Sequence, residues 1–476
     1  MGQYRSVCVT ATYNILLQDD LGRPPGESRL DFSLERALQS TIHLHPGLLY
    51  GVSDESEAGV PLYRQVHHID RQDVLNIVTS QDINSISSES TGKVADALLS
   101  QVLGEGHSEL WPENKPAWRV VVLKHIHDSN NSDSRQSSLI RLDIAFFMHH
   151  AIADGLSGIG FHASFMDIFK SVLGLQNPPS WPMIFEDRRA TPVAIEERVD
   201  CLSCDCNICN SPGVCDQKAW GGAPISLAPT LNFKSLVRIV TIPPKELSSV
   251  LQNCKRSKIT LTGLLHSLIC TTLRRGIKED VPGFRSVTPF SVRRHTGASD
   301  RDIVNHVSFL TSYVSRTELD KIYDCELGST AEEQHIIDLA RSFGKEIMTR
   351  VKEFPHGSMV TRQNRIEDML SHCQSQGGTE RQYTYELSNL GSTSDIVAPE
   401  DSGLELEKLV FTQCGIVAGP AMAFNCASTK GGPLVIGITW ERGIVEEAVV
   451  DHVARELESR LGCGDTDGNH QSQTQG

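Results

Sequence analysis

Residues 141–165 read RLDIAFFMHHAIADGLSGIGFHASF, and this stretch decides which fold we expect. An apolar run, typical of a buried β-strand, ends at two adjacent histidines, His149 and His150. Further along, over residues 156–172, apolar residues recur every three or four positions, as in a helix packed on a sheet. The sequence therefore predicts a strand that ends at the histidines and a helix that begins shortly after them.

The polar residues of this junction allow two interpretations. In the structural one, Asp154 caps the helix and Gly155 takes a backbone angle that a Cβ would forbid. In the catalytic one, a histidine is a general base, because the unperturbed pKa of imidazole is about 6.5. Neighbouring side chains diverge in extended backbone, so only one of His149 and His150 can face a given pocket.

Length and composition narrow the possible classes of protein. A chain of 476 residues exceeds what one compact core usually holds, which favours two domains. The formal charge of -15 argues against a nucleic-acid-binding surface. We find neither a membrane-spanning apolar run nor a signal peptide, and thirteen cysteines without a secretory signal indicate reduced thiols. We expect a cytoplasmic, monomeric protein.

Alternating helical and strand patterns predict a mixed α/β (α+β) fold of two similarly built halves. Residues 7–13 alternate like an edge strand. The predicted units are an N-terminal half (1–190), a crossover loop (191–222), a C-terminal half (223–462) and a disordered tail (463–476).

The segment HHAIADG, residues 149–155, fits the HHxxxDG signature of condensation-domain-like acyltransferases with the chloramphenicol-acetyltransferase fold. Other stretches resemble family elements in the same order. They are LERALQSTIHLHPGLLYGV (34–52), PENKPAWRVVVL (112–123), ITLTGLLHSLICTTLRR (259–275), TPFSVRRH (288–295), YELSNLGS (385–392) and GGPLVIGITWERGIV (431–445). The DFGWG element of the plant branch is missing, so the chain most resembles the fungal alcohol acetyltransferases.

This resemblance implies two chloramphenicol-acetyltransferase-like domains, each a mixed sheet with packed helices, with a tunnel between them. It makes His150 the general base and His149 its support, and it pairs Asp154 with Arg293, directed away from the substrate. Gly155 is implied to let the backbone approach a thioester.

In the C-terminal half, the resemblance places Ser388, Asn389 and Gly391 beside the tunnel, where the first two can steady an oxyanion. A serine nucleophile is not needed, and GLSGIG around Ser157 lacks the order of a nucleophile elbow.

The implied reaction is acyl-CoA-dependent O-acetylation of a small-molecule alcohol, as in secondary metabolism, with acetyl-CoA or another acyl-CoA as co-substrate and no permanently bound cofactor. Several alternatives stay open at this point. They are transfer to an amine, a donor carried on a carrier protein, and an acid-base enzyme or binding module that does not transfer acyl groups.

Two further groups of residues stand out. One is a cluster of five cysteines within the crossover loop: Cys201, Cys204, Cys206, Cys209 and Cys215. It contains two CxxC pairs, but these lie closer together than in zinc sites, so free thiols and a structural metal both remain open. The other comprises Arg274, Arg275 and Arg294, which offer local positive charge for a coenzyme A phosphate, although the first two also fit a solvated helix end.

Overall fold

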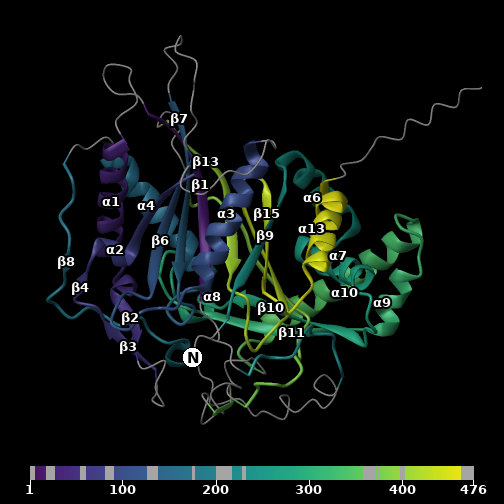
Figure 1. Cartoon of the computed structure of the whole chain (residues 1–476). Coiled ribbons are helices and arrows are strands. Elements are labelled where there is room, and N and C mark those ends of the chain that lie inside the picture. Colours follow the sequence, from purple (N-terminus) through teal and green to yellow (C-terminus); the bar gives the residue numbers. More distant parts are fainter. Residues whose placement is uncertain are drawn as a thin grey trace, which may run out of the picture.

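The computed structural model contains two large mixed β-sheets with helices packed around them, and two small two-stranded sheets (Figure 1). It describes residues 6–17, 27–53, 61–80, 91–125, 138–173, 177–199, 217–227, 232–356, 371–372, 375–396 and 403–462. The predicted tail and the cysteine cluster lie outside these residues. The two large sheets and their helices confirm the expected α/β class.

The first sheet has the strand order β13-β1-β7-β6-β5. Its strands are β13 (Leu404–Gln413), β1 (Val7–Leu17), β7 (Ser138–Met148), β6 (Trp118–His125) and β5 (Leu75–Thr79). Its helices are α1 (Glu27–Leu44), α3 (Thr91–Ser108) and α4 (Gly155–Val172). Shorter elements of this half are η1 (Pro46–Leu49), β2 (Tyr50–Ser53), β3 (Leu62–Gln65), β4 (His68–Ile69), α2 (Arg71–Val74) and β8 (Met183–Ile184). The short helix α5 (Ile195–Arg198) follows them and packs against residues of the second half.

The second sheet has the order β11-β10-β12-β14-β15-β9. Its strands are β11 (Val307–Ser315), β10 (Gly283–Ser291), β12 (Tyr385–Thr393), β14 (Met422–Thr429), β15 (Leu434–Glu441) and β9 (Ser235–Ile242). The helices of this half are α6 (Pro244–Ser257), α7 (Leu261–Gly276), α8 (Arg293–Thr296), α9 (Arg316–Tyr323), α10 (Thr330–Glu353) and α13 (Glu447–Gly462).

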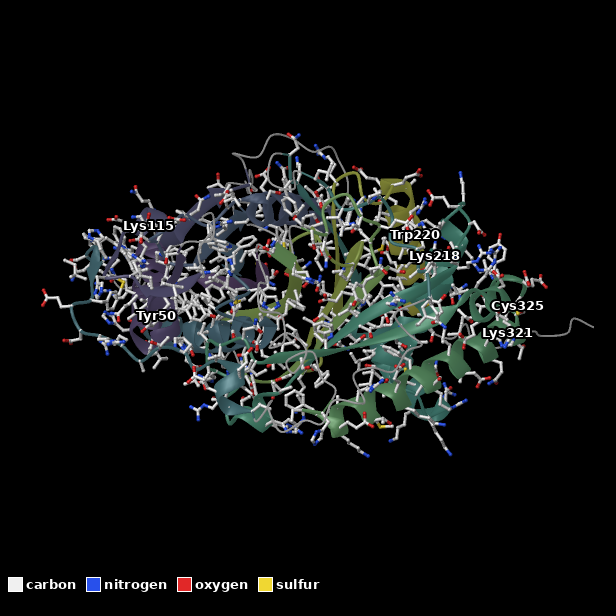
Figure 2. The ribbon with its side chains drawn as sticks, turned by 90° about the horizontal axis from the view of Figure 1, so that it is seen from below. Tyr50, Lys115, Lys218, Trp220, Lys321 and Cys325 are labelled. Carbon is white, nitrogen blue, oxygen red and sulfur yellow. The ribbon has the colours of Figure 1, made fainter. Side chains whose placement is uncertain are left out.

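The two halves lie side by side and are joined by exchanged elements. In Figure 1, α1 and α4 lie at one end of the molecule, and α7, α9, α10 and α13 at the other. The view from below in Figure 2 likewise places Tyr50 toward one end and Lys321 and Cys325 at the other. Between them, β13 of the C-terminal region pairs with β1 of the first sheet, and α3 packs on β9 of the second.

The edge-strand interpretation of residues 7–13 is wrong. Strand β1 lies inside the first sheet, where Val7 pairs with Gln413 on one side and with Met148 on the other. Its partner β13 lies about 400 residues further along the chain, a pairing that no local pattern reveals. The division at residue 222 stays a prediction, and β13 does not respect it, because this strand of the C-terminal region completes the first sheet.

Candidate active site

The histidine motif lies where β7 passes into α4. Strand β7 ends at Met148, and α4 begins at Gly155 after a short turn. Asp154 is the N-cap of α4, and its side chain accepts a hydrogen bond from the backbone N–H of Ser157 at 2.9 Å. The predicted strand, turn and helix are therefore present, and the cap predicted for Asp154 closes the turn.

His150 is held in one tautomer by its own turn. Its Nδ1 lies 2.8 Å from the carbonyl oxygen of Ala153. A carbonyl can only accept, so Nδ1 carries the proton and Nε2 of the neutral ring carries the lone pair. Asn305 donates to the backbone carbonyl of His150 at 2.6 Å and fixes the main chain.

The surroundings of His150 lower its pKa from the ordinary value. Burial is the main cause, and the nearby charge of Asp154 acts in the opposite direction. The imidazole is therefore neutral at neutral pH, which is the form that can accept a proton.

His149 belongs to the support of the turn. Its backbone N–H donates to Ala117 at 2.8 Å, and its Nδ1 accepts from the N–H of Ala151 at 3.0 Å. The ring is buried, with its centroid 6.3 Å from that of Trp111. The ring nitrogen Nδ1 is therefore engaged in holding the backbone turn.

Asp154 and Arg293 form a buried ion pair, with Nη2 2.7 Å from Oδ1. The same Nη2 donates to Ser157 Oγ at 2.9 Å, and the N–H of His306 donates to the other carboxylate oxygen at 3.1 Å. Arg293 also donates to the backbone carbonyls of Ser299, Asp302 and Val304. The carboxylate therefore anchors the start of α4 to the segment before β11, as expected of a structural group.

Gly155 is required for space, and the expectation of a special backbone angle is wrong. It is the first residue of α4 and has no positive φ. A Cβ at this position would lie 2.6 Å from Cδ2 of Leu390 and 3.0 Å from the ring of Phe411. The glycine therefore allows the SNLG segment of β12 to approach the helix.

The side chains of Ser388 and Asn389 point to opposite faces of β12. Asn389 donates to Oγ1 of Thr262 on α7 at 3.1 Å, and its Oδ1 accepts from the N–H of Gly391 at 2.8 Å. Ser388 points to the other face, because successive residues of a strand alternate, and Leu390, beside the irregularity after Asn389, packs against the core of the first half. The Asn389 amide is thus engaged on the α7 side of β12, and Ser388 lies on the opposite side of the strand.

The profile of the alcohol acetyltransferase family matches residues 62–453. The chain belongs to the alcohol acetyltransferase family. It is 27% identical over 403 residues to "Probable alcohol acetyltransferase FCK4" of Fusarium pseudograminearum, covering 80% of this chain and 78% of that protein. It is 21% identical over 378 residues to "Probable alcohol acetyltransferase crmB" of Aspergillus fumigatus, covering 78% of each.

Solved structures bear out the predicted two-domain fold of this alcohol acetyltransferase family member. The trichothecene 15-O-acetyltransferase TRI3 of Fusarium sporotrichioides superposes with a TM-score of 0.65 at 13% identity, covering 97% of this chain and 91% of that one. The epimerization domain of tyrocidine synthetase B superposes at 0.54 with 12% identity, covering 97% and 92%. These likenesses confirm the expected fold, and the family profile and its named relatives confirm the recognised family and the acyltransferase class.

Several residues of this family member's site were not foreseen from the sequence. Asn305 and Tyr63 fix the backbone of the motif, Tyr63 by donating to the carbonyl of Ala151. Ser157, which was considered only as a nucleophile, instead donates to Val304 at 2.8 Å and accepts from Arg293. The spacing from Asp154 to Ser157 was a usable capping signal, whereas nothing local marked Asn305 or Tyr63.

The arginines considered for coenzyme A differ in their surroundings. Arg274 pairs with Asp320 at 2.9 Å, and Arg275 pairs with Glu332 at 3.1 Å. These two therefore belong to the packing of the helical layer, while Arg294 is exposed on α8.

A pocket of about 350 Å³ lies behind the Arg293 anchor, between the end of α1, residues 190–193 and residues 302–306. His150 and the SNLG strand do not line it, so it is not the predicted tunnel. In the parts of the chain that the structure describes, no helix is long and apolar enough to cross a membrane, and no three metal-binding side chains cluster.

Proposed function

We propose that this protein transfers an acetyl group from acetyl-CoA directly to a hydroxyl of a small-molecule alcohol, with His150 as the general base. The observation that carries the proposal is the hydrogen bond from His150 Nδ1 to Ala153, which leaves the proton-accepting lone pair on Nε2. The pKa of His150, lowered by burial, keeps this nitrogen unprotonated at neutral pH.

In the proposed reaction, the alcohol oxygen attacks the thioester carbonyl while its proton passes to Nε2. The tetrahedral intermediate then collapses, the carbon–sulfur bond breaks, and the imidazolium returns the proton to the departing thiolate. The products are the acetate ester and free coenzyme A. No covalent enzyme intermediate is needed, because holding both substrates together already lowers the entropic barrier.

The second half contributes the wall that faces α4. Leu390 comes against Gly155 and sets the distance between β12 and the motif. Ser388 lies on the face of β12 opposite to the Asn389 amide, so its hydroxyl is the member of the SNLG segment that we assign to the oxyanion. The Asn389 amide takes no part in this assignment, because it binds Thr262 and Gly391.

The test is incubation of the purified protein with acetyl-CoA and longer acyl-CoAs, each with a panel of alcohols and amines, followed by mass spectrometry and thiol release. We expect acetyl esters and an equal amount of free coenzyme A. Transfer only to amines, or only from a carrier-protein thioester, would replace the proposed acceptor or donor. The absence of transfer under all conditions would contradict the proposal.

A further inference from the structure

Strand β12 carries one acidic residue, Glu386, on the same face as Ser388. Asn389 and Tyr385 point to the helices, since Asn389 binds Thr262 and Tyr385 hydrogen-bonds to His266 at 2.7 Å. Side chains alternate along the regular part of β12, so Glu386 shares the opposite face with Ser388, and Leu390, which follows Asn389, packs against the core of the first half. Because Leu390 reaches Gly155, this part of β12 meets the start of α4.

Glu386 contacts the first sheet at the level of the strand end that precedes the histidines. Gln413 Nε2, at the end of β13, donates to Glu386 Oε1 at 3.1 Å. Gln413 pairs with Val7, and Val7 pairs with Met148, which directly precedes His149. Two steps between strands, of about 4.8 Å each, therefore separate Gln413 from the end of the strand that carries the motif.

Glu386 differs from the other buried carboxylates of the described residues. Asp143, Asp154, Glu332, Glu441 and Glu35 each lie beside an arginine or a histidine. Glu386 is 7% exposed, and its hydrogen-bond partner is the neutral amide of Gln413. A buried acid without a counter-charge lowers stability, and such groups concentrate at functional sites.

We infer that Glu386 binds the acceptor alcohol through a second hydroxyl, so that the preferred substrates are diols or polyols. This inference rests on the proposed function. A carboxyl group has about four lone-pair positions, of which Gln413 occupies one. A hydroxyl that donates to Glu386 compensates the buried acid and orients the reacting hydroxyl toward His150.

The experiment compares n-alkanols with α,ω-diols of four to twelve carbons, with acetyl-CoA as donor. In the wild-type protein, we expect at least one diol to exceed the alkanol of equal length by about tenfold or more in kcat/KM, beyond the twofold statistical factor. Glu386→Leu should abolish that preference, mainly through the KM of the diol, and leave alkanol turnover within about threefold.

A matched variant, Gln413→Leu, distinguishes substrate binding from a purely structural connection. If Glu386 only joins the two sheets, Gln413→Leu and Glu386→Leu should lower turnover of both alcohols alike. If Glu386 binds substrate, Gln413→Leu should keep the diol preference. Should Glu386→Leu not fold, Glu386→Gln replaces it, and a smaller diol preference in that variant is the expected result.

The outcomes separate the two proposals. Acetylation of alkanols and diols with equal kcat/KM at every length would overturn the role of Glu386 and leave the acetyltransferase reaction intact. Absence of acetyl transfer to every alcohol would instead overturn the proposed function, and the inference with it.

Discussion

Asp154 and Glu386 are both buried carboxylates at the junction of the two halves, yet their surroundings differ in kind. Asp154 accepts from Arg293, Ser157 and the backbone of His306, so its charge is fully compensated. Glu386 accepts from one amide, that of Gln413. The difference teaches that burial alone does not define a role, because a compensated carboxylate builds structure while an uncompensated one is available to a ligand.

The largest effect on activity is expected at His150, whose turn is anchored by the hydrogen bonds of Asp154. His150→Ala should lower kcat/KM by about 10²–10⁴, the usual contribution of a general base. His150→Asn is the matched control, because its amide nitrogen lies close to the position of the histidine Nδ1 and can still donate to the Ala153 carbonyl, but it cannot act as a base. Equal losses in both variants, with unchanged melting temperatures, are expected, and near-normal turnover of either variant would contradict the assignment.

Breaking the ion pair between Asp154 and Arg293 should lower the free energy of unfolding. Arg293→Met leaves Asp154 buried beside no cation, and we expect a loss of about 3–5 kcal/mol in the free energy of unfolding, measured by urea denaturation. Combining it with Asp154→Leu removes the stranded charge, so the double variant should be less destabilised than the sum of the single ones. An additive result would show that the two residues do not act as a pair.

Much of the structure around Asp154, the compensated carboxylate, could be predicted from sequence. The local order of an apolar run, two histidines and an aspartate before a helical pattern specifies the turn and its cap. The pairing with Arg293 followed from family resemblance, and the structure places the two residues 2.7 Å apart.

The surroundings of Glu386, the uncompensated carboxylate, could not be predicted, because they depend on pairing between strands that are distant in the sequence. The contact of Glu386 with Gln413 exists only because β13 joins the first sheet next to β1. The same pairing makes β1 an internal strand and brings Phe411 beside Gly155. A period-2 pattern tells which residues share a face, but it does not tell which strand lies next to which.

The contact between the two regions offers a test of intermediate size. Gly155→Ala introduces a Cβ into the space that Leu390 and Phe411 occupy, which should destabilise the fold by about 1–3 kcal/mol. Leu390→Ala in the same chain vacates that space and should restore part of the loss. If Gly155→Ala is as stable as the wild type, the close approach of β12 to α4 is not required.

The smallest effect concerns how stability depends on pH. Burial raises the pKa of Glu386 from 4.5 to about 7, and the hydrogen bond from Gln413 offsets this only in part. The folded state binds the proton of the Glu386 carboxyl more tightly than the unfolded chain does. The stability that this proton contributes is therefore lost as pH rises from 4.5 through 7. Glu386→Gln removes this loss. The melting temperature of the variant minus that of the wild type should therefore be about 2 °C higher at pH 8 than at pH 5.

Asp154→Asn is the matched comparison for that measurement. It removes the counter-charge of Arg293, so it should lower the melting temperature at pH 5 and at pH 8 alike. If the difference in melting temperature between Glu386→Gln and the wild type is the same at pH 5 and at pH 8, the Glu386 carboxyl is as well compensated as that of Asp154. The contrast between the two carboxylates would then be lost.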